Sequence, residues 1–288
     1  MANAGNGGAG PWRRLWRRLR GNPPALVGLA IVGTLFAVAA LHPWVAPYDP
    51  ARIDVAHILE PPSAAHWCGT DELGRDVFSR LVHGAPVSLL VGFVAVGVSV
   101  TIGLVLGSAA GYYGGLVDSL VMRAVDLVQS IPTFFLILSA IAFLRPSIWI
   151  IMVIIGATGW MGVCRMVRAE ILSLRGREFV LAARVQGAGD LRVLFVHLVP
   201  NAMAPVLVSA TLGVAGAILV ESSLSFLGLG VQPPQPSWGN MLAQARDNLV
   251  GGWWVTVFPG AAIFLTVLGY NLLGEGLRDA LDPRLDRP

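Results

Sequence analysis

The chain has 288 residues, of which 55% are hydrophobic and 13% are charged. Soluble domains carry about 25% charged residues, so this composition predicts a membrane protein. All 20 basic residues are arginine, whereas an ATP site of the P-loop kind needs a lysine, so we expect no such site here. A net charge of +3 gives no reason to expect nucleic acid binding. The two cysteines, Cys68 and Cys164, are too few for a disulfide framework.

Residues 1–24 are predicted to form a polar, basic arm. Gly and Asn dominate its start, a composition typical of disorder. The run WRRLWRRLR follows, and its Trp and Leu residues fall on one helical face, which favours a helix lying along the membrane surface. A signal peptide is the alternative, but the apolar segment that follows is long and lacks a small-residue cleavage site, which favours a retained anchor.

Six apolar segments follow the arm and give residues 25–288 the pattern of an all-α protein with six transmembrane helices. Each has about 17–25 residues, enough to cross the hydrocarbon core, and only helices satisfy their own backbone groups in lipid. The segments are 25–46, 87–111, 127–144, 147–164, 201–220 and 253–274. Six crossings place both termini on one side of the membrane.

The arginines predict which side that is. With the termini inside, fifteen arginines lie inside and five outside, together with seven outside acidic residues. This asymmetry satisfies the positive-inside rule and predicts a multi-pass protein of the cytoplasmic membrane with both termini cytoplasmic. The long connections are then an outside loop at 42–86, a cytoplasmic loop at 165–200 and an outside loop at 221–252. An impermeant thiol reagent is expected to reach Cys68 from outside, unless the fold or a binding protein covers it, but not Cys164.

The cytoplasmic connection between Glu178 and Asn201 is predicted to be a short helix, a glycine turn and a second short helix. Alanines favour a helix over 179–186, and Gly187 allows a sharp turn. Asp190 suits the N-cap of the next helix, and Pro200 is expected to end the unit. Such a unit is either a surface for another protein or a plain connection between two membrane helices.

The first outside loop contains the run HWCGTDELGRDVFSRLVHGA, in which Asp76–Val82 is predicted to form a short helix. The carboxylates at Asp71, Glu72 and Asp76 could indicate acid–base chemistry, but no nucleophile accompanies them. His66 and Cys68 could bind a metal, but they lack partner ligands. We therefore expect a solvated loop with local hydrogen bonds.

Ionisable groups at membrane depth are candidates for function. Asp118 and Asp126 flank Arg123 near the predicted inner boundary, where pairing with Arg123 or contact with water is favoured over a proton relay. Pro132 and Pro205 are expected to interrupt the third and fifth membrane helices, and such breaks often line a cavity.

The second outside loop is predicted to be irregular because glycine and proline are frequent in it. A short helix is possible from Asn240 to Asn248. Glu221 lies at the outer end of the fifth membrane helix, where capping the loop is favoured over contact with a substrate.

Several motifs resemble a known family. The pattern Ala182-Ala183, Gly187 and Val199-Pro200 is similar to the "EAA" loop of ABC-importer permeases, although Leu181 stands where the family often has Glu and Val199 where it has Leu. The outside-loop motif resembles the GTDxLGRDxxSR run of dipeptide and oligopeptide permeases through Gly69, Thr70, Asp71, Gly74, Arg75 and Asp76. The runs GYYGG at 111–115, LSFLGLG at 224–230 and PSWG at 236–239 also resemble that class, and the basic arm resembles its C-type subunit.

The resemblance implies a type I ABC-importer permease subunit that conducts peptides and carries no catalytic site or cofactor of its own. Its implied partners are a second homologous permease, two ATPase subunits or domains and an extracytoplasmic substrate-binding protein. The implied ATPase-coupling residues are Ala182, Ala183, Arg184, Gly187, Asp190 and Pro200. Nickel, glutathione or haem could use the same scaffold, because a fold does not fix its function.

Two further classes of protein stay open as alternatives. An ion-driven secondary transporter would need carboxylates deep in the helices, and the segments 127–144 and 201–220 contain none. A membrane enzyme would need a constellation of nucleophile and base or of metal ligands, which the sequence does not suggest.

Overall fold

The computed structural model describes residues 11–144, 147–246 and 251–281, and all of its regular elements in these ranges are helices. The predicted disordered start of the arm and Asn248 lie outside the described residues. In chain order the elements are α1 (Pro11–Arg20), α2 (Pro23–Val45), the 3₁₀ helix η1 (Val55–His57), α3 (Val77–Tyr113), α4 (Gly115–Gln129), α5 (Thr133–Phe143), α6 (Ile148–Ala157), α7 (Trp160–Leu174), α8 (Glu178–Val185), α9 (Asp190–Arg192), the π-helix η2 (Val193–Leu198), α10 (Val199–Phe226), α11 (Trp238–Ala245) and α12 (Trp253–Leu281).

Four helical runs among the described residues are long and apolar enough to cross a membrane, or up to six if each of two bent pairs is one span. The all-α prediction is therefore confirmed. The second predicted span is much longer than expected, because α3 runs unbroken for 37 residues. The prediction of a separate short helix at Asp76–Val82 is wrong. Asp76 caps α3 itself, accepting from the Ser79 N–H at 2.7 Å, and the helix continues through Pro86.

The third and fourth predicted spans are bent. The chain turns by 84° between α4 and α5 and by 40° between α6 and α7. Pro132 lies at the sharper bend, where it has no N–H to donate and disfavours a helical conformation at the preceding residue. The predicted interruption at Pro132 is confirmed. Pro205 lies inside α10 without ending that helix, so the interruption predicted there is wrong.

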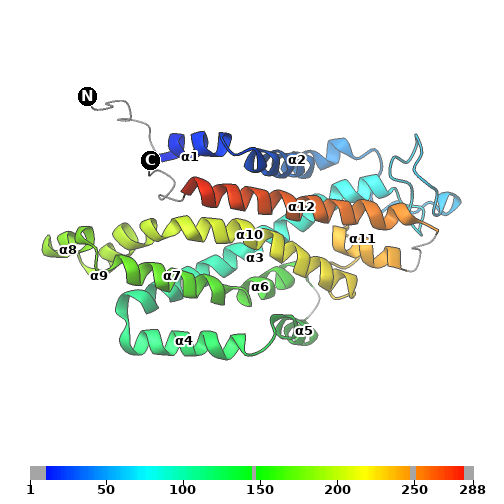
Figure 1. Ribbon diagram of the computed structural model, residues 1–288. Coiled ribbons are helices and arrows are strands. Elements are labelled where there is room, and N and C mark those ends of the chain that lie inside the picture. The colour runs from blue at the N-terminus through cyan, green and yellow to red at the C-terminus, as the bar shows by residue number, and fades with distance from the viewer. Residues whose placement is uncertain (1–10, 145–146, 247–250, 282–288) are drawn as a thin grey trace, which may run out of the picture.

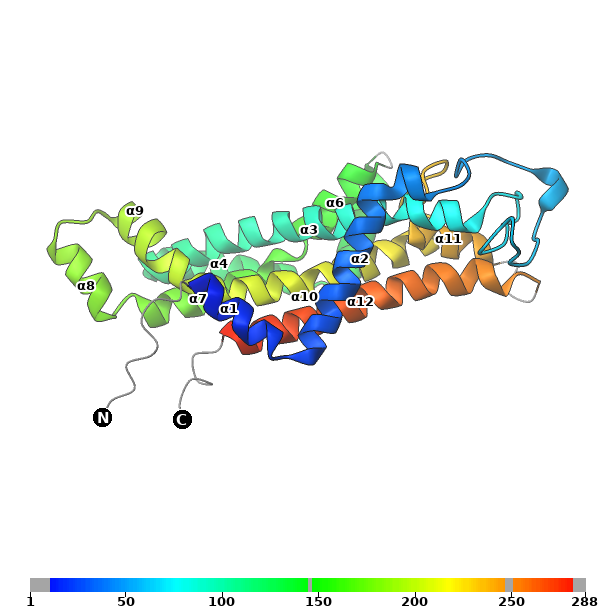
Figure 2. The ribbon, with the colours of Figure 1, turned by 90° about the horizontal axis from the view of Figure 1, so that it is seen from above.

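The helices form an elongated bundle in which α3 contacts α2, α6, α7, α10 and α12 (Figure 1). The unit formed by α8 and α9 projects at one end, where α1 and the C-terminal end of α12 also lie (Figures 1 and 2). The connection at 46–76 and helix α11 lie at the opposite end. The predicted coupling loop, which contains α8 and α9, and the first outside loop therefore lie at opposite ends of the bundle.

The basic helix α1 is fixed to the end of α12. The Arg18 side chain donates to the Ala280 carbonyl at 2.8 Å, and the Asn22 amide donates to Asp279 at 3.2 Å. Asn22 also caps α2, since its side-chain oxygen accepts from the Ala25 N–H at 3.2 Å. Side-chain oxygens at this position satisfy backbone donors that a helix start leaves free.

Glycines let α3 approach α7 very closely. A Cβ atom placed at Gly103 would lie 2.7 Å from the Val163 Cβ, and one at Gly107 would lie 2.5 Å from the Cys164 carbonyl oxygen. At Gly111 the Arg168 carbonyl oxygen would be 2.8 Å away. Small residues give membrane helices this kind of close contact, so three glycines bring α3 against the backbone of α7.

We expect Gly107→Ala to destabilise the protein, because its methyl group would push α3 away from the backbone of α7. Overpacking of this kind costs about 1–3 kcal/mol. The matched control is Gly97→Ala on the same helix, where a Cβ meets no heavy atom within 4 Å and alanine favours a helix by up to about 1 kcal/mol. Thermal unfolding in detergent should show a lower midpoint for Gly107→Ala alone; equal midpoints would contradict the close packing.

Candidate functional site

The projecting unit at the end of the bundle has the predicted helix–turn–helix form. Helix α8 ends at Val185, and Gly187 follows with a φ of +84°. The Gly187 N–H donates to the Arg184 carbonyl at 2.9 Å and the Ala188 N–H to the Ala183 carbonyl at 3.0 Å. This pair of bonds is the Schellman pattern that closes a helix with a left-handed residue. The positive φ at position 187 is therefore the reason why this position needs a glycine.

Helix α8 has one buried face and one exposed face. Val180 and Ala183 are buried, and Val180 packs in a cluster that includes Val193 of η2. Leu181 and Ala182 face outward, and Val185 is 89% exposed. Ala182 is therefore accessible to another protein, whereas Ala183, which the resemblance also assigned to the coupling surface, lies with Val180 on the inner face, three residues apart on the helix.

Asp190 does not have the role predicted for it. The N-cap position is Gly189, and Asp190 is the first residue of α9. Its carboxylate instead accepts from the Tyr112 hydroxyl of α3 at 2.5 Å, and the Arg184 guanidinium lies 5.4 Å from the centroid of the Tyr112 ring. No periodic pattern points to Tyr112, which stands out in the sequence only as part of the GYYGG run.

Pro200 does not end the unit either. It lies in the first turn of α10, and one helical run of 37 residues extends from Asp190 to Phe226 through the π-helix η2. Proline lacks a backbone donor and its ring crowds the carbonyl four residues before it. The wider turns of η2 lie at that point. The projecting unit is thus helically continuous with α10.

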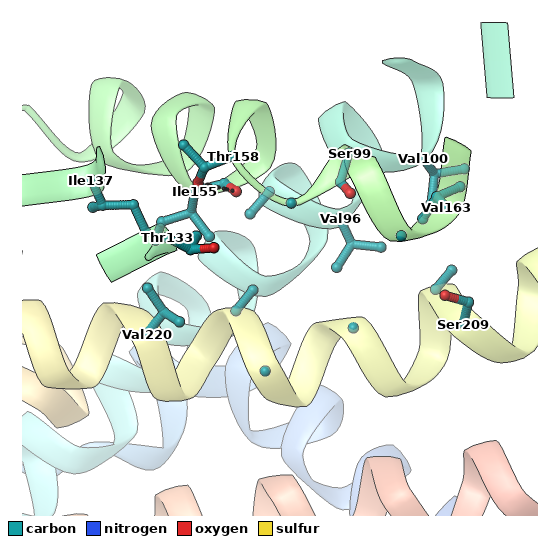
Figure 3. A pocket seen from close by; sticks show the side chains of 17 residues that line it. Val96, Ser99, Val100, Thr133, Ile137, Ile155, Thr158, Val163, Ser209 and Val220 are labelled. Carbon is teal, nitrogen blue, oxygen red and sulfur yellow. Dashed lines mark hydrogen bonds between the residues drawn. The ribbon is translucent and has the colours of Figure 1, made fainter. Parts of the chain in front are cut away.

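A cavity of about 270 Å³ lies between α3, α5, α6, α7 and α10. Figure 3 shows four hydroxyl-bearing side chains around it, which are Ser99, Thr133, Thr158 and Ser209. Small or aliphatic residues supply the rest of the wall, and no described residue that lines the cavity is charged. These lining residues could not be predicted as substrate-binding residues, because they come from segments far apart in the chain.

The outside-loop motif is buried, so the expectation that the loop is solvated is wrong there, whereas the expected local hydrogen bonds are present. The Asp71 carboxylate accepts from the Arg75 Nε at 2.7 Å and lies 3.5 Å from the Arg80 Nε. Both guanidinium groups also donate to the side-chain oxygen of Gln244 in α11, at 2.9 and 3.0 Å. Buried charges need such partners, and this network joins the loop to α3 and α11.

The other motif residues fix the local backbone or a neighbouring side chain. Gly69 and Gly74 have φ values of +73° and +72°, and a Cβ at Gly74 would lie 1.7 Å from the Asp54 carbonyl oxygen. The Thr70 carbonyl accepts from the Trp254 indole at 3.0 Å, and Asp76 holds His66 at 2.9 Å. The structural roles of these residues are therefore sufficient to account for the motif.

Neither chemical alternative for this loop gains support from the geometry. The described residues contain no group of three or more His, Cys, Asp or Glu side chains that could hold a metal ion. Cys68 is only 8% exposed, and burial, with the nearby Asp76 carboxylate, raises the pKa of its thiol to about 11. The fold therefore covers Cys68, which is the condition under which a thiol reagent is not expected to reach it from outside.

The charged residues near the other end of the bundle pair differently from the prediction. Asp118 binds Arg168 of α7 at 2.6 Å, and Asp126 pairs with Arg165 of the same helix. Both carboxylates of α4 therefore pair with α7 instead of Arg123, because α4 folds back along α7. These pairs fix α4 at the side of the bundle.

Glu221 is fully buried in α10. Its carboxylate accepts from the hydroxyls of Ser225 at 2.6 Å and Ser237 at 3.1 Å. Ser237 caps α11 in a reciprocal pair with Asn240, so α11 begins before the predicted start at Asn240. The interpretation that Glu221 holds the second outside loop is confirmed by these bonds.

A membrane-spanning helical bundle with an uncharged cavity between its helices has the architecture of a transport protein. Residues 103–287 match the family described as binding-protein-dependent transport system inner membrane component, and the chain belongs to that family. Residues 10–62 match the N-terminal TM domain of oligopeptide transport permease C. The family resemblance drawn from the motifs is confirmed.

The similarity to individual relatives covers almost the whole chain. The dipeptide transport system permease protein DppC of Alkalihalophilus pseudofirmus is 42% identical over 275 residues, which cover 96% of this chain and 90% of the relative. The di/tripeptide transport system permease protein DppC of Pseudomonas aeruginosa is 43% identical, with coverages of 96% and 93%. The oligopeptide transport system permease protein OppC of Bacillus subtilis is 39% identical, with coverages of 95% and 90%.

We expect Gly187→Ala to loosen the turn of the projecting unit. No heavy atom lies within 4 Å of a Cβ at this position, so the cost is purely conformational and amounts to about 1–2 kcal/mol. Trypsin should then cleave after Arg184 roughly 5–30 times faster, since local opening becomes easier by that factor. Gly189→Ala is the control, because Gly189 has a φ of −69° and equally open space. Equal cleavage rates in the two variants would refute the backbone requirement.

Proposed function

We propose that the chain is a permease subunit of an ATP-driven importer of peptides and forms half of the translocation pathway. The observation that carries this proposal is the similarity, along almost the whole chain, to relatives named as dipeptide, di/tripeptide and oligopeptide permeases. The cavity fits a cargo of variable sequence, because hydroxyl groups can bond to peptide amides while the uncharged walls select for no particular side-chain charge.

The exposed face of the projecting unit is the proposed docking surface for a separate ATPase. Leu181 and Val185 lie one turn apart on the outer face of α8, with Ala182 beside them, and Leu191 is exposed on α9. Exposed apolar groups that gather outside the membrane spans mark a surface that binds a partner. The ATPase would grip this surface, and the continuous helix from Asp190 to Phe226 would carry its movement into the membrane.

The long side of the bundle formed by α4 and α5 is the proposed contact with a second, homologous permease. Leu116, Leu120 and Leu127 are more than two-thirds exposed along α4, and α5 turns from α4 toward the cavity, where Thr133 and Ile137 line its wall. A homologous subunit on this side would close the pathway between the two chains. At the opposite end from α8, the buried Asp71 network would present a rigid surface to a substrate-binding protein.

The reconstituted complex tests this function. Proteoliposomes that contain this chain, its homologous permease, the ATPase subunits and the binding protein should take up a labelled dipeptide only when ATP is supplied. The chain by itself should hydrolyse no ATP and transport nothing. Uptake by the isolated chain under an ion gradient alone would overturn the proposal in favour of a secondary transporter. Failure of the complete complex to move any peptide, with nickel transported instead, would overturn the assignment of the cargo.

The arginine asymmetry and the placement of α8 predict which end of the bundle faces the cytoplasm. An impermeant maleimide added to intact cells should label Val55→Cys, at a residue that is 76% exposed in η1, but should label Val185→Cys only after lysis. The reverse pattern would invert the topology.

The two native cysteines should contribute little background to this labelling. Both are buried, and a thiol with a pKa raised from 9.0 to about 11 carries about 100 times less thiolate at neutral pH. Because the thiolate is the reactive form, any labelling of Cys68 should increase about tenfold for each unit of pH between 7 and 10. A rate independent of pH would show that access, and not ionisation, limits the reaction.

A further inference from the structure

Tyr112 connects the projecting unit to a part of the bundle that is remote from it in sequence. It is the penultimate residue of α3, at the corner where the chain turns into α4. Its hydroxyl donates to the Asp190 carboxylate at 2.5 Å, across 78 residues of chain. A hydrogen bond to an ionised acceptor is about twice as strong as one between neutral groups, so this contact is a strong link between α3 and α9.

The Tyr112 side chain contacts both helices of the projecting unit. The Arg184 guanidinium of α8 lies 5.4 Å from its ring centroid, a distance that gives a cation–π attraction. Tyr112 is only 7% exposed and packs in the same cluster as Val180 of α8 and Leu194 of η2. A displacement of either helix therefore acts directly on this one residue.

The corner beside Tyr112 is attached to the helices around it. Gly114 and Gly115 have φ values of +66° and +54°, which let the chain turn abruptly into α4. The Arg175 side chain donates to the Gly111 carbonyl at 3.3 Å, and Arg168 pairs with Asp118 in the first turn of α4. Force applied to Tyr112 is therefore shared by the end of α3 and the beginning of α4.

Two walls of the cavity are linked to the projecting unit in different ways. One wall belongs to α10, which is helically continuous with α9 and supplies Ser209. The other belongs to α3 and α5, which supply Ser99 and Thr133. Tyr112 lies at the end of α3, and α5 follows α4, so the hydrogen bond to Asp190 joins the unit to the second wall.

We propose that Tyr112, held by Asp190 and Arg184, is a positioning residue for transport that makes both cavity walls follow a movement of the projecting unit. The proposal rests on the proposed function, in which an ATPase moves that unit. Without the link, the ATPase would still bind the exposed face of α8 and still move α10, but the wall built by α3 and α5 would lag behind. ATP would then be hydrolysed with less peptide transported.

Tyr112→Phe in the complete reconstituted complex tests the link, since it removes the hydroxyl and keeps the ring. The ATPase subunits should remain bound, while dipeptide uptake per ATP hydrolysed falls roughly tenfold, the change in an equilibrium constant expected for loss of a hydrogen bond to a charged group. The matched control is the neighbouring Tyr113→Phe, at a residue that is 54% exposed and whose hydroxyl bonds to no described residue. This variant should keep the wild-type ratio of uptake to hydrolysis.

A second variant separates the link from simple misfolding. Asp190 is exposed, so Asp190→Asn should preserve the fold and lower the same ratio, and the double variant should be no worse than Tyr112→Phe alone, because the two groups act as a pair. Additive losses would overturn the proposal. So would a normal ratio in Tyr112→Phe with the ATPases bound, which leaves the proposed function intact.

Two outcomes at the docking step distinguish the proposals from each other. If Tyr112→Phe releases the ATPases, Tyr112 only shapes the docking surface, and the link is refuted. If the wild-type chain itself binds no ATPase through α8, the proposed function fails before the link is tested. Co-purification of the ATPase subunits with each variant makes this distinction.

Discussion

The close approach of α3 and α7 is the constraint on which the rest of this structure depends. Where Gly107 lies against the Cys164 carbonyl, even one methyl group has no room. This seam places α7 where its arginines can pair with Asp118 and Asp126, and so determines where α4 lies. Because α5 follows α4, the position of the cavity wall at Thr133 depends in turn on the same seam.

The ionised groups are sorted by depth along the bundle. One buried network gathers around Asp71 at the end that carries α11, while the pair of Asp118 and Arg168 lies toward the end that carries α8. Between them lies a cavity whose described lining is uncharged. A charge is costly within a bilayer unless it has a partner. This arrangement keeps strong electrostatic contacts for holding helices together and leaves the cavity without a fixed charge that would retain a charged cargo.

Features that depend only on a residue itself and on residues next to it in the sequence could be predicted. Pro132 breaks its helix because of its own covalent structure, and Gly187 makes the turn because of its own φ. The burial of Asp71 could not be predicted, since it depends on Gln244, which is more than 160 residues away in the chain. The role of Asp190 was missed for the same reason: a local rule favoured an N-cap, whereas the tertiary structure brought Tyr112 to its carboxylate.

The length of α3 has a mechanical consequence. Its 37 residues extend for about 55 Å, almost twice the roughly 30 Å of a hydrocarbon core. Both ends of the helix are bonded to other parts of the protein: Arg80 pairs with Asp71 at one end, and Tyr112 donates to Asp190 at the other. The rod is held at its middle by α6, where a Cβ atom at Gly156 would lie 2.5 Å from the Ala95 carbonyl oxygen, so it behaves as a lever whose fulcrum lies within the membrane. Tilting it from one side displaces the opposite end in the reverse direction, so the two membrane faces of this protein cannot be rearranged independently.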